Sequence, residues 1–243
     1  MDQTLIVTAV IACVSVLYAT AGQAGGTAFL AVMAFASFPA VEMRATALFL
    51  NILAAGYATW QARGRLGLDR KLLLQVSVPS LLAAFVGGLV VLGGHVYFVL
   101  TGVLLSIAAA VMIFKRASDD TQVRAVESLP AGLVGAGAGL MSGLTGVGGG
   151  VFLTPMLVGL GWTSPRRAAA LTPPFILCNS VLGFAGVFIA GQRLAPSSAL
   201  YASGALTGAV VGTFIGHRWM SERATRYVLA LIMLAASLRL LTR

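Results

Sequence analysis

Charge is scarce in this sequence, and negative charge is the scarcest. Charged residues make up 9% of the 243 residues, and only seven of them are acidic. Each acidic residue lies at the end of an apolar segment or in a loop: Asp2, Glu42, Asp69, Asp119, Asp120, Glu127 and Glu222. His95 and His217 are also at segment ends. Because proton relays of membrane pumps use carboxylates or imidazoles inside the membrane, the pattern argues against such a relay.

Cysteine and catalytic patterns are also scarce. The two cysteines, Cys13 and Cys178, lie inside apolar segments at no metal-ligand spacing, so we expect small packing residues and neither a metal nor a cofactor. No HExxH, Walker, GxSxG or HxE pattern occurs, so no catalytic residues and no enzyme are expected. The 16 Lys and Arg lie in short loops between apolar segments, which favours anchoring at a membrane face over nucleic-acid binding.

Apolar residues dominate what is present. They make up 58% of the chain, and the mean hydropathy is +0.94. A soluble domain cannot bury that much apolar surface, so the composition predicts an all-α polytopic membrane protein in contact with the lipid bilayer. Charged, glycine or proline punctuation delimits ten segments: 4–21, 26–38, 43–62, 72–92, 95–114, 130–144, 150–161, 167–190, 196–216 and 223–241. Segments 26–38 and 150–161 would form only about 18 Å of helix, too short for a core of about 30 Å.

The most informative stretch is residues 142–157, which read SGLTGVGGGVFLTPML. Three consecutive glycines, Gly148, Gly149 and Gly150, interrupt an apolar context, and such a cluster predicts broken helix. Broken backbone is tolerated at membrane depth only beside protein or a water-filled cavity. The helix that begins near Val151 would point its first N–H groups into the glycine loop, which is the arrangement of an anion site.

A second copy of this pattern indicates an internal duplication. The run from Gly25 to Leu30 aligns with the run from Gly148 to Leu153 at an offset of 123 residues, and the same offset places Arg44 on Arg167. We therefore predict an N-terminal transmembrane repeat at 1–114, a cytoplasmic linker at 115–129 and a C-terminal repeat at 130–243. Each repeat would hold five segments, including a short glycine-interrupted helix pair that is re-entrant or broken.

An odd number of segments per repeat predicts that the two repeats are inverted. If the 63–71 loop is cytoplasmic, twelve Lys and Arg lie inside: Arg63, Arg65, Arg70, Lys71, Lys115, Arg116, Arg124, Arg166, Arg167, Arg218, Arg223 and Arg226. Four remain outside: Arg44, Arg193, Arg239 and Arg243. The positive-inside rule then puts both termini outside. Inverted repeats with short interrupted helices are typical of transporters that bind substrate near the midplane.

Other residues have two interpretations. In segment 167–190, Thr172 and Asn179 share a face, and Asn51 is the nearest polar equivalent in segment 43–62; these residues either line a path or join helices. Arg44 and Arg167 either attract an anion or anchor at the interface. Gly204, Gly208, Gly212 and Gly216 recur at every fourth position, which predicts close helix packing.

The paired motifs, GGTAFL at 25–30 and GVGGGVFLTP at 146–155, resemble the TauE/SafE family of sulfite-exporter-like transporters, as does the block EMRATALFLN at 42–51. The resemblance covers essentially the whole chain, and the first motif departs from it by carrying Gln23 and Thr27. It implies a multi-pass protein of the bacterial inner membrane that transports a small sulfur-containing or organic anion, such as sulfite, thiosulfate or a sulfonate.

We therefore expect an exporter or facilitator. The expected substrate-binding residues are Gln23, Gly25, Gly26, Thr27, Asn51, Thr145, Gly146, Gly148, Gly149, Gly150, Thr172 and Asn179, and the expected gating residues are Arg44 and Arg167. A passive anion channel and a non-transporting membrane scaffold or assembly factor are the alternatives. The partners expected are a small anion and lipid, not nucleic acid, and a homo-oligomer is compatible with the sequence.

Overall fold

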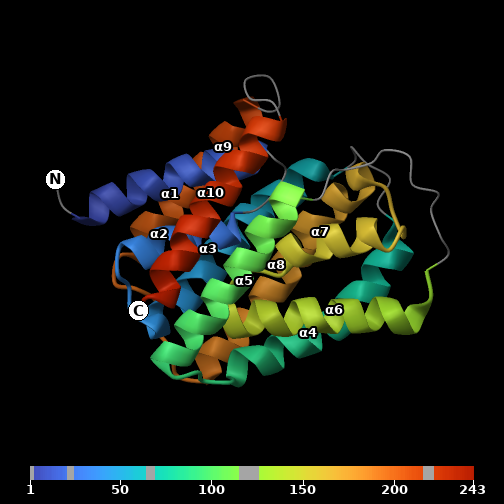
Figure 1. Ribbon diagram of the computed structural model, residues 1–243, viewed down its shortest axis with the longest axis horizontal. Helices are drawn as coiled ribbons and strands as arrows, with labels where there is room; N and C mark the ends of the chain where they lie inside the picture. The colour runs from blue at the N-terminus through green and yellow to red at the C-terminus, as the bar shows by residue number, and fades with distance from the viewer. Residues whose placement is uncertain (1–2, 21–24, 64–68, 115–125, 216–221) are drawn as a thin grey trace.

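The computed structural model describes residues 3–20, 25–63, 69–114, 126–215 and 222–243. These residues form ten α-helices and no strand (Figure 1). The helices are α1 (Gln3–Thr20), α2 (Gly26–Phe35), α3 (Ala40–Ala62), α4 (Arg70–Leu89), α5 (Gly94–Phe114), α6 (Ser128–Thr145), α7 (Gly150–Gly159), α8 (Pro165–Ile189), α9 (Ser198–Ile215) and α10 (Glu222–Leu241). Each falls on one predicted segment, and the all-α class is confirmed.

Within the described ranges, five helices are long and apolar enough to cross a membrane: α1, α4, α5, α8 and α9. Large apolar side chains on their outer faces are exposed, for example Leu82 at 70% and Phe214 at 79%. The protein is therefore a multi-pass membrane protein. By contrast, α2 and α7 have 10 residues each, about 15 Å of helix, and neither can cross a bilayer alone.

The first helices of the two halves begin at opposite ends of the bundle. Gln3, at the start of α1, shares a surface pocket with the α2–α3 turn and the loop before α9. Ser128, at the start of α6, accepts a hydrogen bond of 2.8 Å from Gln75 near the start of α4, and the far end of α4 contacts Arg44 beside the α2–α3 turn. Figure 1 shows α1 and α6 running in opposite directions, with both termini on one side. The duplication and its membrane orientation stay predictions.

Two glycine seams join the halves. On α9, Gly204, Gly208 and Gly212 face backbone carbonyls of α1, and a Cβ at Gly208 would lie 2.3 Å from the Ala12 oxygen. The packing role predicted for these α9 glycines is thus confirmed, while Gly216 lies outside the described residues. On α6, a Cβ at Gly139 would lie 2.1 Å from the backbone oxygen of Ser80 on α4. One turn away on either side, Gly135 and Gly143 face the backbone oxygens of Val76 and Ala84 in the same way. A two-fold relation between the halves would exchange these two seams.

The core surrounds α2. Phe29, Leu30 and Met33 have no exposed surface, and side chains of α1, α3, α5, α9 and α10 join the same apolar cluster. The short helix is therefore buried from Gly26 to Ala34, and only Phe35 at its C-terminal end is exposed; broken backbone at membrane depth requires such cover. The packing role expected for the cysteines is wrong: Cys13 and Cys178 are both exposed on the outer faces of their helices.

Candidate functional site

The loop between α6 and α7 is built from glycines in the left-handed region. The φ angles of Gly146, Gly148 and Gly149 are 85°, 86° and 73°. Residues with a side chain rarely adopt this backbone conformation, so the turn requires glycine at these positions. The loop reverses the chain inside the protein, and α7 begins at Gly150 with Gly149 as its N-cap. The helix break predicted at the triple glycine is confirmed.

The N-terminus of α7 carries backbone donors that have no acceptor among the residues the structure describes. In the described part of the chain, the first hydrogen bonds of this helix are made by Phe152 and Leu153, which donate to the Gly149 carbonyl at 3.2 Å each. No described hydrogen bond uses the N–H groups of Gly148, Gly149, Gly150 or Val151. Their positions are buried or half-buried. Adjacent N–H groups at a helix N-terminus attract an anion through their partial positive charge.

The first motif meets the second at this loop. A Cβ at Gly26, the first residue of α2, would lie only 2.2 Å from the Val147 carbonyl oxygen, so the two backbones are in direct contact. Gly25 has a φ of 88° and caps α2 as Gly149 caps α7. The two short helices therefore begin next to each other, although their motifs lie 123 residues apart in the sequence.

Asn51 contacts both glycine motifs where they meet. It lies midway along α3, has no exposed surface, and donates from Nδ2 to the Gly146 carbonyl at 3.1 Å. Its amide atoms would be 2.7 and 2.8 Å from a Cβ at Gly26 and are also the neighbours of Gly148. Its Oδ1 has no hydrogen-bond partner among the described atoms. One side chain thus contacts both glycine motifs.

Two of the expected polar site residues lie on α8. Thr172 shares a hydrogen bond of 2.7 Å with Thr154 on α7, and its Cγ2 would be 2.7 Å from a Cβ at Gly150. Asn179 lies further along α8 and accepts a hydrogen bond of 2.8 Å from Ser80 on α4. Thr172 therefore contacts the glycine loop, and Asn179 lies in the α4–α6–α8 seam.

Of the remaining expected residues, Thr145 lies at the loop and Thr27 does not. Thr145 accepts a hydrogen bond from Tyr97 on its carbonyl at 2.9 Å and ends α6 at the loop. Thr27 is hydrogen-bonded to the hydroxyl of Tyr18, which turns it toward α1. Gln23 lies outside the described residues.

The two arginines related by the sequence offset have different environments. Arg44 is 1% exposed and donates to three carbonyls at the end of α4: Val90 at 2.7 Å, Gly87 at 2.9 Å, and Gly88. A cation at a helix C-terminus satisfies carbonyls that have no helical partner and complements the helix dipole. The interfacial-anchor interpretation is therefore wrong for Arg44. Arg167 is exposed in the first turn of α8. A gating role for either residue stays a prediction.

The sequence model of the family described as Sulfite exporter TauE/SafE matches residues 7–240. The chain belongs to the TauE/SafE family. It is also 29% identical over 232 residues to the Probable membrane transporter protein y4hK of Sinorhizobium fredii, an alignment that covers 94% of each chain. No solved structure matches it. The protein is accordingly a membrane transporter of the TauE/SafE type, which is not an enzyme class.

Sequence reasoning missed two buried hydroxyls of this TauE/SafE protein. Ser142 on α6 and Ser180 on α8 have no exposed surface, and the oxygen of each lacks a hydrogen-bond partner among the described atoms. Ser142 lies beside the loop, since its Cβ would be 3.4 Å from a Cβ at Gly149. A lone serine in an apolar segment carries no signal in the sequence, because only the packing shows which neighbours it has.

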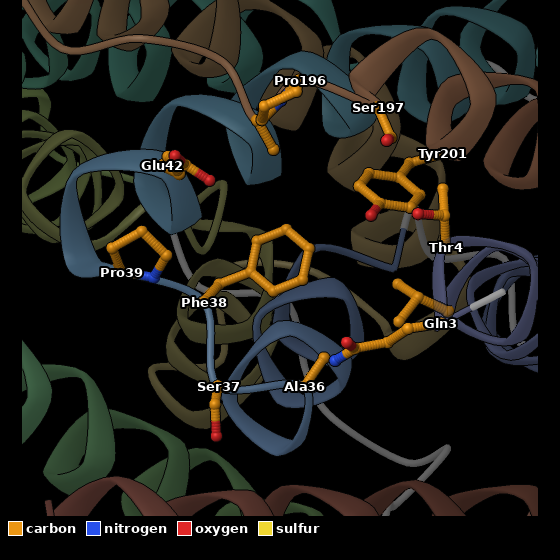
Figure 2. A pocket seen from close by; sticks show the side chains of 12 residues that line it. Gln3, Thr4, Ala36, Ser37, Phe38, Pro39, Glu42, Pro196, Ser197 and Tyr201 are labelled. Carbon is orange, nitrogen blue, oxygen red and sulfur yellow. The ribbon is translucent and has the colours of Figure 1, made fainter.

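A separate pocket of about 270 Å³ opens at the end of the bundle that holds both termini. Figure 2 shows the Phe38 and Tyr201 rings together on its wall, with Glu42 at its edge. The ring centroids are 5.7 Å apart. Arg243 closes the neighbouring turn by donating to the carbonyls of Ser37 and Phe38. None of the predicted site residues lines this pocket.

Proposed function

We propose that this TauE/SafE transporter carries a small sulfur-containing or organic anion, such as sulfite, thiosulfate or a sulfonate, and binds it where the two glycine motifs meet. The observation that carries the proposal is the set of N–H groups from Gly148 to Val151 that have no acceptor among the described residues, next to the start of α2. Asn51 and Asn179 lie near the middle of α3 and α8, so the binding place would be near the midplane of the bilayer.

The charges around the meeting point favour an anion. No Asp or Glu lies in the interior of a described helix: Glu42 and Glu222 are in first turns, and Asp69 and Glu127 precede their helices. Fixed N–H dipoles attract a negative group at any ordinary pH because they do not titrate. The family name, Sulfite exporter TauE/SafE, supports sulfite as one member of the substrate class.

The same arrangement suits export without a coupled proton. An inside-negative potential favours anion exit by about 2.3 kcal/mol per charge per 100 mV. We therefore propose an exporter or facilitator driven by membrane potential. A passive anion channel would use the same groups, and saturable counterflow distinguishes the transporter from it. The partners proposed are this anion and, in the membrane, a second copy of the chain.

The test is flux of a permanently ionised sulfonate in proteoliposomes under clamped potential, with and without a pH gradient. We expect flux that follows the potential, saturates with substrate and is unchanged by the gradient. A strict requirement for the gradient at zero potential would contradict proton-independent transport, and the absence of flux for every oxyanion supplied would contradict the proposed function.

A further inference from the structure

The seam between α4, α6 and α8 contains buried donors that the helices themselves do not use. Ser142 Oγ and Asn179 Nδ2 are inaccessible and have no hydrogen-bond partner among the described atoms. Both side chains have no exposed surface. A buried polar group left without a partner costs about 1–3 kcal/mol, so two such donors in one seam indicate a missing acceptor.

Ser142 lies beside the glycine loop, and Asn179 lies one helical turn from a residue that contacts it. The Ser142 Cβ is 3.4 Å from the Cβ position of Gly149. Asn179 lies one turn from Ile176, whose side chain contacts the Cβ positions of Gly148 and Gly150. On its other side, one turn away, Gly183 packs against Gly143 on α6. Asn179 therefore lies on α8 between a residue that contacts the glycine loop and a residue that packs against α6, and its amide is hydrogen-bonded to α4.

Ser80 orients the side-chain amide of Asn179. Its hydroxyl donates to Asn179 Oδ1 at 2.8 Å, and the Ser80 side chain is completely buried against Gly139. Because Ser80 donates to this oxygen, it fixes which amide atom is which, and Nδ2 is the amide atom of Asn179 left without a partner among the described atoms. The hydroxyl of Ser142 is free to rotate and can likewise donate.

We infer that Asn179 Nδ2 and the Ser142 hydroxyl complete the oxyanion site begun by the α7 N–H groups, and that Ser80 is a positioning residue that orients the Asn179 amide. The inference rests on the proposed function and deepens it. It makes the site asymmetric: the half containing α7 supplies the donors, whereas Asn51 of the other half already donates from Nδ2 to the Gly146 carbonyl. An acceptor-rich group with several oxygens bound to one centre satisfies such a set of donors.

The test compares substrate half-saturation in sulfonate counterflow for the full-length protein and three variants. Asn179→Asp keeps the volume and the bond from Ser80 but replaces the N–H donors with a negative acceptor, so half-saturation should rise about tenfold or more. Ser80→Ala leaves the amide free to rotate and should raise half-saturation about threefold or more. The control is Ser237→Ala, which also removes a buried, hydrogen-bonded hydroxyl, but between α5 and α10. It should leave half-saturation unchanged.

A double-mutant cycle separates positioning from general packing. In an Asn179→Ala background, Ser80→Ala should have no further effect on half-saturation, because there is no amide left to orient. Equal effects of Ser80→Ala in both backgrounds would overturn the positioning role. Normal half-saturation in Asn179→Asp would overturn the site itself while leaving the proposed function standing, since that function fails only if the wild type moves no oxyanion.

Discussion

Asn51 on α3 donates a hydrogen bond of 3.1 Å to the carbonyl of Gly146, 95 residues later in the chain. This bond joins the first half of the protein to the loop that interrupts the second half. Because a Cβ at Gly26 would also meet the Asn51 amide, the three segments can approach one another only with glycine at position 26. The arrangement of the proposed anion site therefore depends on close backbone contact and not on a charged side chain.

Replacing Gly26 with alanine should separate the two motifs. The added Cβ would lie 2.2 Å from the Val147 oxygen, and such overpacking of a core costs about 1–3 kcal/mol. We expect a lower melting temperature and loss of sulfonate flux. Gly94→Ala is the matched control, since Gly94 also begins a helix but has nothing within 4 Å of its Cβ position. Wild-type flux in Gly26→Ala would contradict the close contact.

The α4–α6 seam makes a separate prediction about stability. Gly139→Ala places a Cβ 2.1 Å from the Ser80 oxygen and should destabilise the protein by about 1–3 kcal/mol. Gly137→Ala, on the same helix with open space around its Cβ position, should be neutral or stabilising by up to about 1 kcal/mol, because alanine favours helix. Thermal unfolding in detergent measures both, and equal melting temperatures for the two variants would contradict the seam.

Replacing Arg44 should lower the stability of the protein, because its side chain is a structural helix cap. Arg44→Gln leaves carbonyls of Gly87, Gly88 and Val90 without their donor, and we expect a loss of about 1–3 kcal/mol or more in unfolding free energy. Arg167→Gln, at the exposed position, should have wild-type stability. If Arg44→Gln kept wild-type stability and lost only flux, the side chain would be a gating group and not a helix cap.

The charge count predicts the membrane orientation. Arg193 and Arg70 are exposed at opposite ends of the bundle, so each can be replaced by cysteine with the same loss of one charge. In a background lacking Cys13 and Cys178, Arg193→Cys should react with an impermeant thiol reagent added outside intact cells, and Arg70→Cys should not. If only Arg70→Cys reacted, the orientation would be the reverse of the predicted one.

Much of the fold was predictable because helices in lipid have strong sequence signals. Ten apolar segments bounded by charge or glycine predicted ten helices, and the shortness of α2 and α7 followed from Gly25–Gly26 and Gly148–Gly150. These signals are local: each depends on hydropathy or on the backbone cost of glycine within a few residues.

The site was only partly predictable because its geometry depends on contacts between distant segments. The sequence offset pairs Arg44 with Arg167, yet one is buried against α4 and the other is exposed. Likewise, Ser80 and Asn179 are 99 residues apart, and no local pattern links a hydroxyl to an amide at that distance. The packing role of Gly135, Gly139 and Gly143 on α6 was also missed, because Gly132 and Gly137 on the same helix break the every-fourth spacing that is visible on α9.

The most direct test locates the anion itself. Crystals of a variant with the exposed Cys13 and Cys178 replaced by alanine, grown with selenite as a heavy analogue of sulfite, allow the selenium position to be found by anomalous diffraction. We predict a peak within hydrogen-bonding distance of the Gly149 and Gly150 nitrogens, beside Asn179 and the start of α2. A peak only in the pocket of Figure 2, between Phe38 and Glu42, or no peak at selenite concentrations that saturate flux, would contradict binding at the glycine motifs.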